Sequence, residues 1–274
     1  MTLNIGQILG DAFGILRRRF LAMLGAWAVF SAAIFALLFL LGISAEGAAS
    51  SAGLMGIVGN IIMSALTNGQ TVAMTALASP LSRDSFGEAL VTGFKGGLTM
   101  FVLTVVVFFL VLIVGLIFVL VFSIAAFAGG SVGAVIIGLL SFAGGLYFLC
   151  RLALLGPVIA VEKAFNPITA VNRAWATSRG HVVSLFVLLA IVLLGGLLVI
   201  GLPLFLMFAG GVGDEIIAGA DAEEIATRIE AVGAGLLVIF PLAIVWQFFA
   251  LALYAATHAR LTDTTAERMA EVFE

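Results

Sequence analysis

Long apolar stretches alternate with short polar segments along this chain of 274 residues. A helix needs about 20 apolar residues to cross the hydrocarbon core of a bilayer, and six stretches are that long. Each should be helical, because unpaired backbone groups are not tolerated in lipid. The six predicted spans are Phe20–Ile43, Gly53–Ala78, Leu98–Phe122, Val132–Leu155, Val182–Phe208 and Val232–Ala256.

A basic, amphipathic stretch precedes every second span, and it recurs at a constant step of 81 residues. Phe13, Phe94 and Trp175 mark this step. A fixed period indicates one structural unit used repeatedly. We therefore expect an all-α membrane domain over residues 1–274, built from three interfacial-helix-plus-hairpin repeats. The repeats cover about 1–80, 81–162 and 163–260, and a short cytoplasmic tail covers 258–274.

The composition agrees with a membrane protein. Hydrophobic residues make up 63% of the chain and charged residues 10%, with a mean hydropathy of +1.29. A soluble domain averages about 25% charged residues. The single cysteine, Cys150, excludes an intramolecular disulfide and a multi-cysteine metal site. His181 and His258 lie far apart in the sequence, so no metal or cofactor is predicted.

The positive charges predict the orientation. Nearly all Lys and Arg residues lie near the termini or in the second and fourth loops. Basic residues favour the cytoplasmic side, so we expect a multi-pass inner (plasma) membrane protein with both termini in the cytoplasm. The loop at about 209–231 should face the opposite side. Asp221 and Glu224 predict a short capped helix in this loop, which also contains Asp214, Glu215, Glu223 and Glu230.

The basic amphipathic stretches are typical of helices that lie in the headgroup region. One interpretation is that they only anchor the topology and pack against the spans. The other is that their basic faces recognise anionic lipid headgroups. The residues concerned are Arg17, Arg18, Arg19, Lys95, Arg173 and Arg179.

Arg151 is the most informative single residue, because charged residues within apolar spans are candidates for function. A continuous helix would put Arg151 and Glu162 on one face, although Pro157 should bend it. Arg151 is either structural, tied to a carboxylate or to carbonyl groups, or it binds an anionic group. Together with Glu162, Arg173, Trp175 and Arg179 it forms a candidate polar cluster, either structural or for an anionic headgroup.

The second predicted span is unusually polar. Polar groups inside spans bond between helices or line a cavity, so this span predicts either helix-to-helix contacts or a polar permeation or binding path. Its polar residues are Asn60, Ser64, Thr67, Asn68 and Gln70, and Gln247 in the sixth span is a similar case.

The segment from Arg151 through Pro157 to Glu162, followed by Arg173-Ala174-Trp175 and Gly180, resembles the membrane-domain family named after glycerophosphoryl diester phosphodiesterases and its uncharacterised bacterial six-helix relatives. Ala174 replaces the usual Ser of that pattern. The resemblance implies a six-helix membrane domain. It does not imply phosphodiesterase activity, since Arg179-Gly180-His181 is not the catalytic His-Arg-Gly of that enzyme.

Three functional hypotheses follow. The first is a non-enzymatic inner-membrane protein that binds or organises lipids, or supports a protein partner, through its basic cytoplasmic helices. The second is a transporter or channel-like protein with a path along the second span. The third is an intramembrane lipid-modifying enzyme that uses Arg151 to hold a phosphate, although the sequence offers no nucleophile and base pair. Membrane lipids, anionic ones in particular, are the expected partners, and nucleic acid is not.

Overall fold

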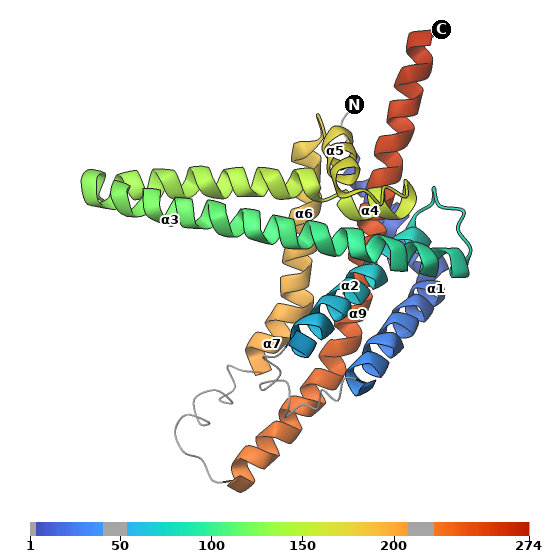
Figure 1. Cartoon of the computed structure of the whole chain (residues 1–274), viewed down its shortest axis with the longest axis horizontal. Helices are drawn as coiled ribbons and strands as arrows, with labels where there is room; N and C mark the ends of the chain where they lie inside the picture. The colour runs from blue at the N-terminus through green and yellow to red at the C-terminus, as the bar shows by residue number, and fades with distance from the viewer. Residues whose placement is uncertain (1–3, 41–53, 208–221, 274) are drawn as a thin grey trace. The chain divides into compact units, whose positions relative to one another are not determined.

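The computed structural model describes residues 4–40, 54–207 and 222–273, and within these ranges every regular element is a helix (Figure 1). Their order is α1 (Ile5–Leu40), α2 (Leu54–Ala78), α3 (Phe86–Leu152), α4 (Leu155–Val161), α5 (Pro167–Thr177), α6 (Val182–Gly196), η1 (Leu197–Gly201), α7 (Leu202–Met207) and α9 (Ala222–Phe273). The all-α class predicted from the sequence is confirmed for this part of the chain.

Five segments of these helices are long and apolar enough to cross a membrane, as expected for a multi-pass membrane protein. They are Ile5–Leu40, Phe86–Leu120, Val135–Val161, Val182–Leu206 and Gly235–Asp263. Each overlaps one of the predicted spans, although the predicted ends at Ile43 and Phe208 lie outside the described residues. The remaining predicted span, Gly53–Ala78, coincides with α2, whose polar residues lower its hydropathy below that of the five.

The chain forms two compact units. The first contains Met1–Phe186 and Leu251–Glu274, and the second contains Val187–Ala250. In the second unit, Trp246 of α9 packs over the glycines of α6. A methyl group on Gly195 would lie 2.0 Å from the Trp246 ring. This crossing therefore requires a residue without a side chain.

Within the first unit, α3 doubles back on itself, as its ribbon shows (Figure 1). Contacts near its two ends require the helix to reverse direction. Thr99 near its start donates a 2.6 Å hydrogen bond to the Phe165 carbonyl, and Arg151 near its end donates a 3.0 Å bond to the Trp175 carbonyl. A straight helix would separate Thr99 from Arg151 by about 80 Å. The two arms of α3 correspond to the third and fourth predicted spans.

The helices α2 and α3 cross with their backbones in contact. A methyl group on Gly97 would lie 2.6 Å from the Ala65 carbonyl oxygen, and one on Gly93 would lie 2.7 Å from the Gly69 carbonyl oxygen. Gly93 and Gly97 are four residues apart and share one helix face. Small residues at this spacing let membrane helices approach closely, and this contact fixes α3 against α2.

The 81-residue step reappears in the burial pattern. Ile8, Ala89 and Ala170 are buried at equivalent positions, and one helical turn later Ala12, Gly93 and Ala174 are buried as well. Phe13 and Phe94, which mark the step in the sequence, are instead more than half exposed. Beside each aromatic residue that marks the step lies a buried helix face, made of Ile8 and Ala12 in the first stretch and of alanine and glycine in the other two.

The three amphipathic stretches are not alike. The first two form the beginnings of the long helices α1 and α3. The third is a separate helix, α5, because Asn166 caps its start, Pro167 follows as the first helical residue, and Gly180 with φ +83° ends the segment. A left-handed φ suits glycine after a helix C-terminus.

The predicted acidic loop is described only in part. Asp214, Glu215 and Asp221 lie outside the described residues. The backbone from Ala222 onward belongs to α9, which continues to Phe273. The expected short capped helix is thus the beginning of a long helix.

Candidate functional site

The segment after α3 brings most of the predicted polar cluster together. Pro157 lacks an N–H group, and in a continuous helix its ring would collide with the carbonyl of Ala153. The chain therefore turns at Ala153 and Leu154 and restarts as α4 at Leu155. This break means that Arg151 and Glu162 do not share one helix face, contrary to the simplest prediction.

Arg151 lies at the end of α3 and is 8% exposed. Its Nε donates a hydrogen bond to the Tyr147 hydroxyl at 3.0 Å, and its Nη1 donates to the Trp175 carbonyl at 3.0 Å and to the Ser178 hydroxyl at 3.4 Å. Its guanidinium carbon lies 4.8 Å from the Trp175 ring centroid and 5.3 Å from that of Tyr147. The sequence predicts that a structural Arg151 binds either a carboxylate or carbonyl groups. In the structure it binds a carbonyl, that of Trp175.

No carboxylate pairs with Arg151 among the described residues. Neutral acceptors and two aromatic faces therefore stabilise this buried charge, and aromatic faces attract guanidinium groups most strongly where water is excluded. The arrangement joins the end of α3 to α5. It also orients Trp175, one of the three residues that mark the repeat.

Glu162 follows α4 and connects α5 with α9. Its Oε1 lies 3.0 Å from His258 Nε2, and its Oε2 accepts a hydrogen bond from Arg173. The hydrogen bond from His258 lowers the pKa of Glu162 below the ordinary value of 4.5, with Arg173 acting in the same direction and burial opposing both. His258 is fully buried, and its Nδ1 has no partner among the described residues.

Two further ion pairs fix neighbouring segments. Lys163 Nζ lies 2.9 Å from Asp84 Oδ1, which ties the residue after Glu162 to the segment before α3. Arg260 of α9 donates to Asp11 Oδ2 of α1 at 2.7 Å and 2.9 Å. The last pair joins the beginning and the end of the chain across 249 residues.

A pocket of about 580 Å³ adjoins the Arg260–Asp11 pair. We call it the basic pocket. Its wall consists of one face of α1, the end of α2 and one face of α9, and it falls within the range of volumes typical of small-molecule sites. The lining residues are Gly10, Asp11, Gly14, Ile15, Arg18, Arg19, Ala78, Ser79, Pro80, Ala256, Ala259, Arg260 and Asp263.

Arg18 and Arg19 of this pocket are exposed and pair with no carboxylate in the described part of the chain. Gly10 and Gly14 keep the α1 wall free of side chains, and nothing lies within 4 Å of a methyl group placed on Gly10. Ser79 adds a hydroxyl group. Two free guanidinium groups and a hydroxyl around an open volume can hold a phosphate or a carboxylate.

A second cavity, of about 460 Å³, lies between α2 and the first arm of α3. We call it the polar groove. It contains four of the predicted intramembrane polar residues, together with Thr104 of α3. Thr67 and Asn68 donate to the carbonyls of Met63 and Ser64 one turn back. The lining residues are Asn60, Met63, Ser64, Thr67, Asn68, Phe101, Thr104, Val105 and Phe108.

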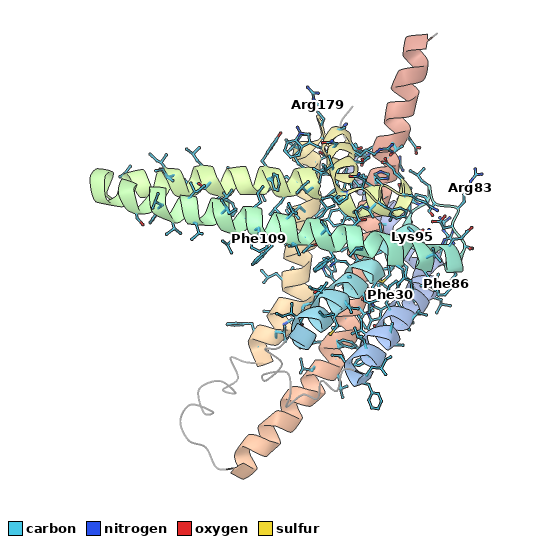
Figure 2. The ribbon with its side chains drawn as sticks, viewed as in Figure 1. Phe30, Arg83, Phe86, Lys95, Phe109 and Arg179 are labelled. Carbon is cyan, nitrogen blue, oxygen red and sulfur yellow. The ribbon has the colours of Figure 1, made fainter. Side chains whose placement is uncertain are left out.

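The remaining predicted site residues lie elsewhere. Gln70 is buried against α1, where its Nε2 donates to the Trp27 carbonyl at 3.1 Å and to the Ser31 hydroxyl at 3.3 Å. Gln247 lies in the second unit and is partly exposed. Arg17 and Lys95 are exposed and do not line the basic pocket. Arg179 is exposed too and points away from the ribbon (Figure 2).

Sequence reasoning missed several partners. The sequence predicts no contact for His258, Ser178 or Asp11, and Arg260 enters only as one of the basic residues that predict the orientation. Tyr147 lies one helical turn before Arg151, a spacing that brings side chains together, whereas Asp11 and Arg260 are 249 positions apart and no local pattern joins them. Within the described residues, no group of three or more His, Cys, Asp or Glu residues could hold a metal ion.

Comparison with known proteins gives no match: no protein-family model, no curated protein and no solved structure matches the chain. The family resemblance therefore stays a prediction. The basic pocket, the polar groove and the contacts of Arg151 are the features of the described residues that could serve a function.

Proposed function

We propose that this chain is a non-enzymatic inner-membrane protein that binds phospholipid through the headgroup phosphate. The observation that carries the proposal is the basic pocket, in which Arg18 and Arg19 face an open volume without a carboxylate partner. Guanidinium groups match phosphate oxygens in pairs of parallel hydrogen bonds. A phosphate in the pocket would supply a counter-charge for these two guanidinium groups.

The position of the pocket along the helices supports a lipid as the ligand. Arg18 and Arg19 come directly before the apolar stretch that begins at Phe20. Arg260 lies near the end of the apolar segment Gly235–Asp263 of α9. Basic residues at the ends of spans lie at the depth of the headgroups, where anionic groups are concentrated. Acyl chains of the bound lipid would then run along the apolar surfaces of the same helices.

The proposal includes the predicted topology. We propose that α2 crosses the membrane as a sixth span, with its polar residues turned toward α1 and α3. Six spans would bring both termini to the cytoplasmic side, where the basic stretches are expected. A relation to the phosphodiesterase membrane-domain family would agree with this topology, and the proposal stands without it.

Gentle extraction of the full chain followed by native mass spectrometry tests the proposal. We expect a phospholipid adduct on the wild-type protein. The double variant Arg18→Ala/Arg19→Ala should lose most of it, because the phosphate would lose both of its unpaired cationic partners. Arg17→Ala is the matched control, since Arg17 belongs to the same basic run but does not line the pocket.

Equal adduct on the Arg18/Arg19 variant and on the wild type, with both folded, would contradict the proposal. An equal loss of the phospholipid adduct in Arg17→Ala would show that the adduct depends on the net positive charge of this stretch and not on the pocket. A stoichiometric protein partner in place of lipid would favour a supporting subunit instead.

The polar groove favours a second candidate, a transport path beside α2. Asn60, Ser64, Thr67 and Asn68 share this groove, whereas Gln70 is bonded to α1. Tracer flux into proteoliposomes should fall in an Asn60→Leu/Thr67→Val variant and persist in Gln70→Leu. This candidate would be contradicted if the wild type shows no flux, or if the flux is unchanged in the Asn60→Leu/Thr67→Val variant.

A further inference from the structure

The basic pocket is not uniformly positive. Five charged residues line it: Arg18, Arg19 and Arg260 carry positive charge, and Asp11 and Asp263 carry negative charge. A pocket selective for a purely anionic ligand has no use for carboxylates, which would repel it. The arrangement of the two signs therefore carries information about the ligand.

The charges divide into satisfied and unsatisfied groups. Arg260 and Asp11 neutralise each other through two hydrogen bonds to the same carboxylate oxygen, at 2.7 Å and 2.9 Å. This pair stabilises the pocket wall and leaves little charge for a ligand. Arg18, Arg19 and Asp263 have no ion-pair partner among the described residues.

The three unsatisfied groups come from two helices. Arg18 and Arg19 belong to α1, and Asp263 belongs to α9, three residues after Arg260. A ligand within the pocket thus has guanidinium groups on the α1 wall and a carboxylate on the α9 wall. The complement of this set is a molecule with a phosphate at one end and an ammonium group at the other.

We infer that the basic pocket selects an amine-bearing phosphate, the phosphoethanolamine type of headgroup, over phosphates without an amine. Arg18 and Arg19 hold the phosphate oxygens, and Asp263 accepts hydrogen bonds from the ammonium group. Such a ligand pairs all three free charges at once, whereas a phosphate without an amine leaves Asp263 unpaired beside it. The inference rests on the proposed function and adds the chemical class of the ligand.

The same chemistry occurs in a membrane phospholipid and in a free aminoalkyl phosphate. The pocket volume of about 580 Å³ leaves room beyond the headgroup for a glycerol backbone. The location beside two apolar helices favours the lipid. The experiment must nevertheless separate the two sources.

The test measures lipid retention by the full chain in detergent, with phosphatidylethanolamine and phosphatidylglycerol of identical acyl chains offered together. We expect the wild type to retain phosphatidylethanolamine in preference. Asp263→Asn should reduce that preference by about 5-fold, the effect of about 1 kcal/mol for one partly exposed ion pair. Arg18→Ala/Arg19→Ala should lose both lipids, and Arg17→Ala should behave as the wild type.

The outcomes distinguish a failure of amine selectivity from a failure of phosphate binding. Equal retention of both lipids, lost in the Arg18/Arg19 variant, would overturn the amine selectivity and leave phosphate binding in place. A preference that survives Asp263→Asn would overturn the role of Asp263. Retention of neither lipid, with displacement of a fluorescent phosphate probe by free phosphoethanolamine, would keep the headgroup chemistry and overturn the lipid as its source. If the folded protein retains neither lipid and free phosphoethanolamine displaces no phosphate probe, both the amine selectivity and the phosphate binding are overturned.

Discussion

Arg151 donates a 3.0 Å hydrogen bond to the carbonyl oxygen of Trp175 while its guanidinium carbon lies 4.8 Å from the Trp175 ring centroid. One side chain therefore holds both the backbone and the ring of a residue 24 positions away. The contact joins the end of the α3 hairpin to the short helix α5. It does so without a carboxylate, so the charge of Arg151 is stabilised by dipoles and aromatic faces.

We expect Arg151→Met to destabilise the protein by about 2 kcal/mol, because it removes charged hydrogen bonds to three acceptors. Arg151→Lys should recover little, since an ammonium group cannot reproduce the planar fork of a guanidinium. Unfolding in mixed micelles with increasing SDS measures the change. Arg179→Ala is the control, as Arg179 is exposed on the same segment. A variant with Met at position 151 that is as stable as the wild type would show that desolvation of Arg151 cancels its contacts.

The contacts of Glu162 with His258 and Arg173 predict a dependence of stability on pH. Hydrogen bonding to His258 lowers the pKa of Glu162 below 4.5 in the folded protein, so its stabilising contribution is complete above pH 4.5 and is lost as the pH falls through the folded-state pKa. Glu162→Gln should cost about 1 kcal/mol at neutral pH. The difference between variant and wild type should shrink in acid. Thermal unfolding from pH 7 to pH 3 measures this, and a constant difference would contradict it.

The α2–α3 crossing should not tolerate a side chain at Gly97. A methyl group there would lie 2.6 Å from the Ala65 carbonyl oxygen and 2.7 Å from the Gly69 Cα, both of them backbone atoms that cannot rotate away. We expect Gly97→Ala to cost about 1–3 kcal/mol in SDS unfolding. Gly115→Ala, in the same helix with nothing within 4 Å, should be neutral or stabilising. Equal effects at the two positions would contradict the crossing.

The two intramembrane glutamines should differ. Gln70 bonds to the Trp27 carbonyl and the Ser31 hydroxyl of α1, so Gln70→Leu should destabilise the α1–α2 contact by about 0.6 kcal/mol per lost bond. Gln247 makes no such interhelical bond among the described residues, and Gln247→Leu should change stability little. SDS unfolding of the two variants in parallel measures the difference between their stability changes. Equal stability changes would contradict a role for the hydrogen bonds of Gln70 to α1.

Local features were readable from the sequence because they depend on nearby residues. Apolar length predicted helices at the positions of α2 and of both arms of α3. Pro157 predicted an interruption, and the structure turns at Ala153, where a proline four residues later prevents a continuous helix. Positions separated by the 81-residue step, Ala12, Gly93 and Ala174, are all buried, and the three-repeat arrangement stays a prediction.

The sequence by itself determined the helical class, the apolar segments and the concentration of basic residues at their ends. The helical class follows because backbone N–H and C=O groups in lipid must form their hydrogen bonds within each segment. The tertiary structure alone decided which polar groups meet: Glu162 with His258, Arg260 with Asp11, and Arg18, Arg19 and Asp263 around one pocket. The physical reason is that a helix apolar on every side, such as the arms of α3, can rotate in lipid at little cost. Its orientation is set by close contacts such as Gly97 against Ala65. The spacing of Gly93 and Gly97 indicates a close approach, but the sequence does not identify the helix that approaches.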